Sequence, residues 1–121
     1  MEPPSNKLLI GIVGPCGAGK STLSAGLKNH GYTCRHIAQE HSYVQAMWQK
    51  ITKPDVLIYL NASFPVSTRR RKLNWQPKDH EEQLRRLSHA RQHANLLIDT
   101  DDLTPEQVLQ KVLDYLKEIK P

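Results

Sequence analysis

The residues best suited to chemistry lie near the start of the chain, in a glycine-rich stretch that ends in a lysine and two hydroxyl side chains. The stretch consists of Gly14, Pro15, Cys16, Gly17, Ala18, Gly19, Lys20, Ser21 and Thr22. It fits the phosphate-binding pattern G-x-x-x-x-G-K-[ST] at every fixed position. Glycines let backbone N–H groups approach a polyphosphate, Lys20 can reach the β- and γ-phosphates, and the Ser21 hydroxyl can ligate Mg²⁺. The stretch therefore predicts a site for ATP and Mg²⁺.

The segments on either side of this stretch fit the same interpretation. An apolar run of strand length covers residues 8–13, and apolar residues at helical spacing predict a helix over 20–29. The start of such a helix supplies free N–H donors and the positive end of its dipole. A glycine-rich turn with a chance lysine is the alternative, which the agreement of the motif with both flanks disfavours.

An acidic partner for the metal or the acceptor is harder to assign, because no apolar strand ends in a single aspartate of the Walker B type. Glu40 follows the strand predicted over 32–38, and it could bind Mg²⁺ through water or take a proton from an acceptor hydroxyl. It fits equally well as a surface carboxylate at the start of the next helix. Asp99 is a second candidate, but its position at the last strand favours a turn-capping role.

Two basic groups lie later in the chain, one over residues 69–72 and one formed by Arg85, Arg86 and Arg91. Arginine side chains can neutralise charge on a transferring phosphoryl group. Each of these arginines taken alone fits a solvated helix face. We expect at least one of the set to contact phosphate.

Histidine and cysteine give weaker signals. His89 and His93 lie four residues apart on a predicted helix, a spacing compatible with zinc, but no third ligand lies near them in the sequence. We expect Cys16 to be a spacer within the loop that is open to alkylation. A cysteine in such a loop, with Cys34 as the second cysteine of the chain, indicates a reducing compartment and no disulfide framework.

Length and charge bound the remaining choices. The chain has 121 residues and a formal net charge of +5, which suits a single domain over 1–121 with one modest core and an anionic ligand. We expect residues 1–6 to be a disordered lead-in. The sequence has no signal-peptide pattern and no apolar run of membrane-spanning length, so we expect a cytoplasmic protein.

The pattern of apolar residues predicts alternating strands and helices. Strands are predicted over 8–13, 32–38, 55–60 and 96–98, and helices over 20–29, 44–51, 65–73, 79–94 and 105–119. Asp79 is expected to cap the fourth helix together with Glu82, and Thr104 to cap the last together with Gln107. Such alternation implies an α/β fold with right-handed crossovers and a parallel sheet. Ligands bind these sheets at the carboxyl ends of the strands.

The chain resembles the P-loop small-molecule kinases, a group that includes nucleoside monophosphate, shikimate and gluconate kinases. The resemblance rests on the loop over 14–21, on the arginine-rich helical segment before the last strand, and on the ending over 97–106. It implies a three-layer α/β/α fold of the P-loop NTPase class. It further implies that Arg70 or Arg71 stacks on adenine and that Arg85 or Arg91 clamps the phosphates as part of a lid.

The chain departs from these kinases between its second and third strands. The kinases have five parallel strands in the order 2-3-1-4-5 and an inserted segment that binds the acceptor, whereas only residues 38–54 separate the two strands here. We therefore expect four strands, with the second beside the first, in the order 2-1-3-4. The acceptor is expected to be a small metabolite or nucleotide, which the sequence does not name.

Three functions remain open at this point. The first is an ATP-binding, Mg²⁺-dependent, kinase-like phosphotransferase with Lys20, Glu40, Arg85 and Arg91 as candidate catalytic residues. The second is a non-catalytic or weakly hydrolytic nucleotide-binding module, which the short acceptor region favours. The third is a nucleic-acid-binding protein, which the basic tracts suggest and the scarcity of aromatic residues disfavours. A second copy of the chain could complete the site in a homodimer.

Overall fold

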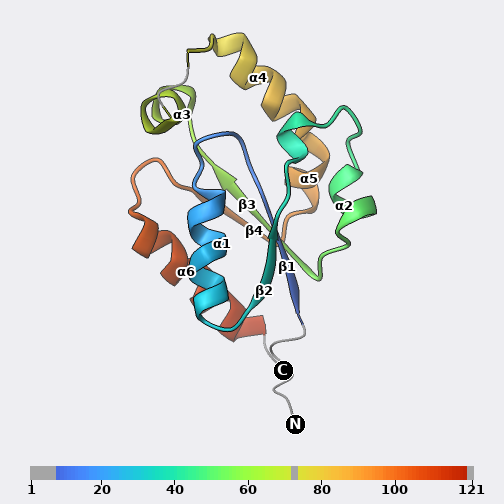
Figure 1. Cartoon of the computed structure of the whole chain (residues 1–121), viewed down its shortest axis with the longest axis vertical. Helices are drawn as coiled ribbons and strands as arrows, with labels where there is room; N and C mark the ends of the chain where they lie inside the picture. The colour runs from blue at the N-terminus through green and yellow to red at the C-terminus, as the bar shows by residue number, and fades with distance from the viewer. Residues whose placement is uncertain (1–7, 72–73, 120–121) are drawn as a thin grey trace.

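The computed structural model describes residues 8–71 and 74–119, and its centre is a four-stranded parallel sheet (Figure 1). The strands are β1 (Leu9–Val13), β2 (Thr33–His36), β3 (Val56–Asn61) and β4 (Leu96–Asp99), in the order β2-β1-β3-β4. This order confirms the prediction that the second strand lies directly beside the first. The lead-in expected over 1–6 and the last two residues of the helix expected over 65–73 lie outside the described residues.

Helices connect the strands and cover both faces of the sheet. They are α1 (Lys20–Asn29), the short 3₁₀ helix η2 (Gln39–His41), α2 (Met47–Ile51), α3 (Phe64–Arg71), α4 (Pro77–Arg86), α5 (Ser88–His93) and α6 (Pro105–Ile119). α1 and α6 pack on one face of the sheet, and α2 and α5 pack on the other (Figure 1). Within the described ranges, none of these helices combines the length and the apolar character needed to cross a membrane.

The alternation of side chains along the strands divides the core between the two faces. On β3, Ile58 and Leu60 pack with α1 and α6, whereas Leu57 and Tyr59 pack with α2 and α5. β1 and β3 are buried along nearly their whole length, because both are central strands with helices on each face. β2 and β4 are edge strands and bury one residue each. The buried ends of β1 and β3 therefore hold in place the loops that follow them, which begin at residues 14 and 62.

The second helix is shorter than the sequence predicts because a glutamine side chain bonds to its backbone. A helix was expected over 44–51, and α2 forms only over Met47–Ile51. Gln39 Nε2 donates to the Val44 carbonyl at 2.8 Å, and Gln39 Oε1 accepts from the Trp48 amide at 2.8 Å. These bonds satisfy the backbone on either side of 45–47 without a further helical turn.

The helix predicted over 79–94 is divided into α4 and α5, and a second glutamine accounts for the break. Gln45 Nε2 donates to the Arg85 carbonyl at 2.8 Å, and Gln45 Oε1 accepts from the His89 amide at 3.1 Å. In a continuous helix the His89 amide would bond to the Arg85 carbonyl directly. The Gln45 side chain takes the place of that bond, so the chain can bend at Leu87, which is fully buried.

The predicted cap of α4 is wrong, and the predicted cap of α6 is confirmed. α4 is capped by Gln76, whose amide donates to Asp79 Oδ2 at 2.8 Å, so Asp79 is the third residue of the helix and not its cap. Pro77 starts the helix two residues earlier because its fixed φ suits the first helical position. At α6, Thr104 and Gln107 exchange the expected pair of bonds, at 2.8 and 3.1 Å.

Candidate functional site

Residues 14–21, which we call the glycine loop, join the carboxyl end of β1 to the start of α1. A Cβ atom on Gly14 would lie 2.1 Å from the Leu60 carbonyl oxygen, so only glycine allows this approach to β3. Gly19 caps α1 with φ 96° and ψ 23°, a conformation that glycine adopts without strain. No side chain caps the first amides of α1, and amides at this position lack intrahelical acceptors. The loop therefore offers backbone donors and a positive helix end to an anion.

The Lys20 ammonium is held beneath the glycine loop by three acceptors. Nζ donates to the carbonyls of Gly14 at 2.7 Å and Pro15 at 3.1 Å, and it pairs with Glu40 Oε2 at 3.0 Å. Lys20 is 6% exposed and Glu40 is 3% exposed. Glu40 Oε1 has no hydrogen-bond partner among the described residues. A buried carboxylate oxygen without a partner is costly, so this atom marks a place where a further donor or a cation would be stabilised.

Glu40 reaches Lys20 because η2 directly follows β2. The Ile37 amide donates to the Ile12 carbonyl at 2.9 Å, which extends the pairing of β2 with β1 past the end of the strand. Arg86 Nη1 donates to the Glu40 carbonyl at 3.3 Å and so links η2 to α4. The sequence left Glu40 open as a site residue or a surface carboxylate, and the structure places it in the buried group beside Lys20.

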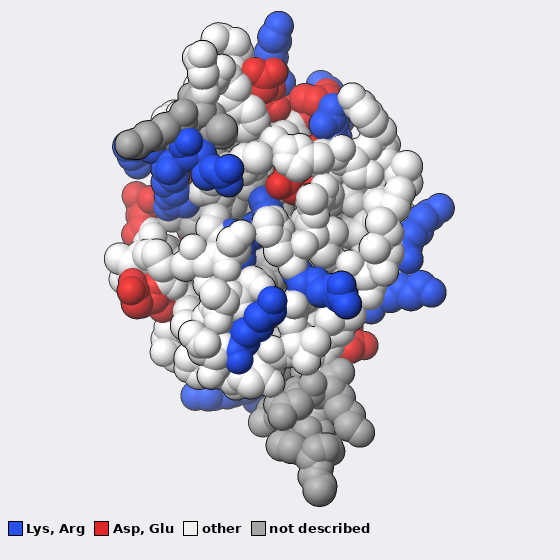
Figure 2. All heavy atoms as spheres, viewed as in Figure 1, with Lys and Arg blue, Asp and Glu red and all other residues white. Residues whose placement is uncertain are grey.

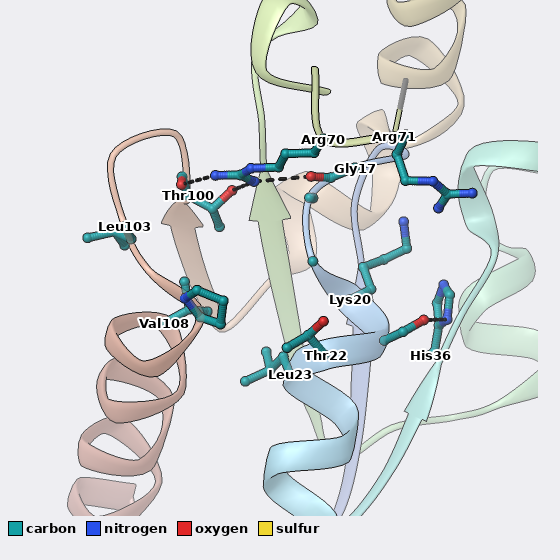
Figure 3. Close-up of a pocket in the computed structure, with 14 residues that line it drawn as sticks. Gly17, Lys20, Thr22, Leu23, His36, Arg70, Arg71, Thr100, Leu103 and Val108 are labelled. Carbon is teal, nitrogen blue, oxygen red and sulfur yellow. Dashed lines mark hydrogen bonds between the residues drawn. The ribbon is translucent and has the colours of Figure 1, made fainter. Parts of the chain in front are cut away.

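Ser21, the candidate Mg²⁺ ligand, lies exposed on the first turn of α1 beside β2. Its Oγ is 3.3 Å from His36 Nδ1 (Figure 3). Burial, and next the nearby Lys20 charge, lower the pKa of His36 from its ordinary value of 6.5. A neutral imidazole can either donate to or accept from the hydroxyl, so His36 can turn the Ser21 oxygen toward a cation.

A cavity of about 320 Å³ opens above the glycine loop and continues toward the loop between β4 and α6. Its lining residues are Gly17, Ala18, Gly19, Lys20, Ser21, Thr22, Leu23, His36, Arg70, Arg71, Thr100, Leu103, Pro105 and Val108. One end is formed by loop backbone and cations, and the other by apolar side chains from the start of α6 (Figure 3). The cavity therefore has the polarity that a ligand with a charged end and a flat apolar end requires.

Arg70 ties the two ends of this cavity together. Its Nη1 donates to the Gly17 carbonyl at 3.1 Å and to Thr100 Oγ1 at 3.0 Å, and its Nη2 donates to the Thr100 carbonyl at 2.6 Å. Thr100 is buried and also donates to the Asn61 carbonyl at 2.9 Å. Arg71 points away from Arg70, toward the side where Lys20 and His36 lie (Figure 3). Both arginines named from the resemblance thus lie at the cavity.

The helix α4 contacts the glycine loop through a glutamine. Gln83 Oε1 accepts from the Cys16 amide at 3.0 Å, and Gln83 Nε2 donates to Cys16 Sγ at 3.2 Å. Gln83 is 7% exposed, so these bonds are made in a largely dry environment. Sequence reasoning missed Gln83, because a glutamine in the middle of a helix gives no signal of its own. Thr100, by contrast, lies within the ending over 97–106 on which the resemblance to kinases rests.

The two candidate lid arginines do not line the cavity. Arg85 is exposed and pairs with Glu82 on the same helix. Arg91 is also exposed, and its guanidinium carbon lies 6.0 Å from the centre of the Tyr59 ring. Asp99, the second acidic candidate, accepts from the Asp101 amide at 3.2 Å, which is a turn contact as expected. These three residues are not brought together with Lys20.

No family model matches this chain, and no curated protein matches it.

Proposed function

We propose that this chain is a P-loop NTPase-class protein that binds ATP with Mg²⁺ and transfers a phosphoryl group to a small metabolite or nucleotide. The observation that carries the proposal is the cavity above the glycine loop. It begins at the free amides of α1 and at Lys20, and it ends at apolar side chains of α6. The phosphates of a nucleotide would lie at the first end of the cavity, and its base would lie at the second.

The phosphate end is supported by the cations and donors around the glycine loop. The ammonium of Lys20 donates to the carbonyls of Gly14 and Pro15. It can exchange these neutral acceptors for phosphate oxygens, because bonds to charged acceptors are stronger. Arg71 adds a second positive group on the same side. Mg²⁺, when bound, would neutralise phosphate charge and align the reacting oxygens. Ser21 would hold it, with His36 orienting the hydroxyl.

The base end is supported by the loop between β4 and α6. Leu103 and Val108 present apolar surface there, and the guanidinium of Arg70 is fixed nearby by Thr100. A planar guanidinium can stack on an aromatic base. This is the role that the resemblance to kinases implies for Arg70 or Arg71.

Transfer would require a group that takes the proton of the acceptor hydroxyl. Glu40 is the candidate, because its Oε1 lies buried without a partner next to Lys20. The carboxylate would accept the proton as the hydroxyl oxygen attacks the terminal phosphoryl group. Lys20 would remain beside the developing charge and stabilise it.

A nucleotide-binding module without transfer is a second candidate, and one observation favours it. The connection between β2 and β3 consists of η2 and α2, whose Gln39 and Trp48 side chains are buried in the protein's own interior. This connection therefore adds no separate segment that could hold an acceptor. Nucleic-acid binding is less favoured, because Figure 2 shows lysine and arginine in separate groups on the viewed face and not as one continuous stripe.

Calorimetric titration with ATP, GTP and ADP in the presence of Mg²⁺ tests nucleotide binding. We expect micromolar ATP binding that is lost in Lys20→Ala and retained in Lys111→Ala, which removes an exposed lysine of α6 outside the cavity. Absence of binding to the wild-type chain would overturn the proposal. Equal binding by wild type and Lys20→Ala would place the nucleotide elsewhere.

A screen of acceptor hydroxyls against wild type and Glu40→Gln separates the two candidates. Phosphorylated product from the wild type, with a much lower rate for Glu40→Gln at unchanged ATP affinity, is the expected result. ATP binding without any product would favour the binding module.

A further inference from the structure

A cluster of three potential metal ligands lies on the α4 side of the glycine loop, outside the residues that line the cavity. Cys16, Glu40 and His41 each offer one ligand atom, and these atoms all lie within 4.8 Å of one another. Within the described ranges no other group of three histidine, cysteine or acidic side chains is as close. The His89 and His93 pair considered from the sequence is not part of such a group.

We propose that Cys16, Glu40 and His41 form a binding site for a divalent transition metal of the Zn²⁺ class. A thiolate, an imidazole and a carboxylate are the three side-chain ligands that zinc takes in proteins. The proposal does not depend on nucleotide binding, because it uses only side chains that the folded chain already brings together. A metal on Glu40 Oε1 would occupy the oxygen assigned above to the acceptor proton, so the two roles exclude each other in one molecule.

The separations between the ligand atoms are close to those that zinc imposes. Bonds of about 2.0 to 2.3 Å in tetrahedral geometry put neighbouring ligand atoms about 3.4 to 3.6 Å apart. Cys16 Sγ lies 3.9 Å from His41 Nε2, and His41 Nε2 lies 3.7 Å from Glu40 Oε2. The sulfur–nitrogen edge therefore needs to close by only about 0.3 Å, and the Glu40 carboxylate lies close to the same nitrogen. The side chain of His41 is 59% exposed, so it can make this movement and solvent metal can reach the site.

The buried oxygen of Glu40 is the independent sign that a cation fits here. Glu40 Oε1 has no hydrogen-bond partner in the described part of the chain although the residue is 3% exposed. Lys20 occupies only Oε2, so one oxygen can keep the ammonium while the other takes a metal. A bound cation would remove the cost of this unpaired buried oxygen.

A neighbouring side chain already supports the cysteine ligand. Gln83 Nε2 donates to Cys16 Sγ at 3.2 Å, and Gln83 Oε1 fixes the Cys16 amide at 3.0 Å. Donors of this kind orient ligands and tune their affinity. With three protein ligands, the remaining position would stay open to water or to an anion, and binding would release the thiol proton to solvent.

The test uses Co²⁺ and Zn²⁺ with the full chain under conditions that keep its thiols reduced. Co²⁺ should give the intense thiolate charge-transfer absorption of a cysteine-ligated metal, and this band should be absent in Cys16→Ser. Zn²⁺ affinity, measured by competition with a chromophoric chelator, should fall about 100-fold or more in Cys16→Ser and His41→Gln. It should fall about tenfold in Gln83→Leu, in the range for loss of an outer partner.

His93→Gln is the matched control, because it removes an exposed histidine from the competing pair on α5. It should bind Zn²⁺ as the wild type does. The proposal is overturned if wild type shows no charge-transfer band, or if Cys16→Ser and His41→Gln bind Zn²⁺ as tightly as wild type. Loss of affinity in His93→Gln equal to that in His41→Gln would also overturn it, by moving the site to α5. Thermal melts of each variant confirm that it is folded.

Discussion

The two arginine-bearing helical segments that flank the glycine loop look alike in sequence and lie differently in the structure. α3 carries Arg70 and Arg71 into the cavity lining. The α4–α5 segment carries Arg85 and Arg91 outward, where one pairs with Glu82 and the other lies by the Tyr59 ring. The residue that α4 contributes to the loop is a glutamine, Gln83.

The difference follows from how each segment leaves the sheet. α3 begins three residues after β3 ends, at the edge where ligands bind parallel sheets, so its last turn lies over the glycine loop. α5 packs on the other face, where Leu87 and Ala90 lie in the core, and α4 contacts the glycine loop and η2 instead. Because Leu87 and Ala90 face the core, the nearby Arg85 and Arg91 side chains are left exposed to solvent. Whether a helix presents its arginines to an anion therefore depends more on where the helix lies relative to the end of the sheet than on how many arginines it carries.

The largest effect should come from Arg70. Arg70→Ala removes three hydrogen bonds that hold the Gly17 carbonyl and Thr100 at the cavity. Without these bonds the cavity wall is less ordered, and the guanidinium that would stack on the base is lost. We therefore expect Mg²⁺–ATP affinity to fall about 30-fold, or about 2 kcal/mol, by calorimetry. Arg70→Lys should recover little of it, because an ammonium lacks the planar fork.

Arg85→Ala is the paired variant on α4. It should leave the affinity for Mg²⁺–ATP within about twofold of wild type, since an exposed ion pair contributes about 0 to 1 kcal/mol and lies outside the cavity. If Arg85→Ala weakened nucleotide binding as much as Arg70→Ala, α4 would act as a phosphate clamp and the contrast between the segments would fail.

The second effect concerns the glutamine that α4 sends to the loop. Gln83→Leu should lower the free energy of unfolding by about 1.5 kcal/mol, because it leaves the Cys16 amide without its partner in a largely dry environment. Chemical denaturation measures this change. A matched substitution on the exposed side of α6, Gln110→Leu, should cost less than about 0.5 kcal/mol. Equal effects of the two substitutions would show that Gln83 does not anchor the loop.

A smaller difference in stability is expected between substitutions of two neighbouring arginines of α4, Arg85 and Arg86. Arg86 donates to Glu82 Oε2 at 3.1 Å and to the Glu40 carbonyl at 3.3 Å, and its guanidinium lies 4.3 Å from the centre of the Tyr43 ring. Arg86→Ala should therefore lower the unfolding free energy by about 1 kcal/mol. Arg85→Ala should lower it by about 0.3 kcal/mol. Denaturation midpoints in the reverse order would contradict this assignment.

The smallest effect is a dependence on alkaline pH at the Tyr59 ring. Burial raises the pKa of Tyr59 to about 12, and the Arg91 charge opposes that rise. Because the folded-state pKa is raised, the stabilising contribution is present below pH 10 and falls as the pH rises from about 10 toward about 12. The loss is on the order of 1 kcal/mol near pH 10.5. Tyr59→Phe should be less sensitive to alkaline pH by that amount in denaturation experiments, and an unchanged pH profile would contradict it.

Much of the fold could be predicted from the sequence, because it depends on local apolar patterns and on strong helix signals. The apolar runs over 8–13 and 55–60 predicted the strands β1 and β3, and the short connection between the second and third strands predicted the sheet order. The breaks at 44–46 and at Leu87 could not be predicted. The break at 44–46 depends on side-chain bonds of Gln39 that replace a helical turn. The break at Leu87 depends on Gln45, which bonds to Arg85 and His89 far along the chain.

The candidate site also contains residues that could be predicted from the sequence and residues that could not. The glycine loop is contiguous in sequence, so its residues were all found. The burial of Glu40 beside Lys20 depends on η2 following β2 and on side chains from α4, and the sequence left two interpretations open. Gln83 and His36 were missed because their partners, Cys16 and Ser21, become neighbours only when the sheet and its helices assemble.

The measurement that tests the central claim most directly is an NMR titration of the amides of the ¹⁵N-labelled chain with a non-hydrolysable ATP analogue and Mg²⁺. If the nucleotide lies in the cavity above the glycine loop, the largest shifts will be at Gly19, Lys20 and Ser21, with further shifts at Thr100 and Leu103. The amides of α5 will not move. Shifts that are absent from the glycine loop, or that are centred on α4 and α5, would contradict the account.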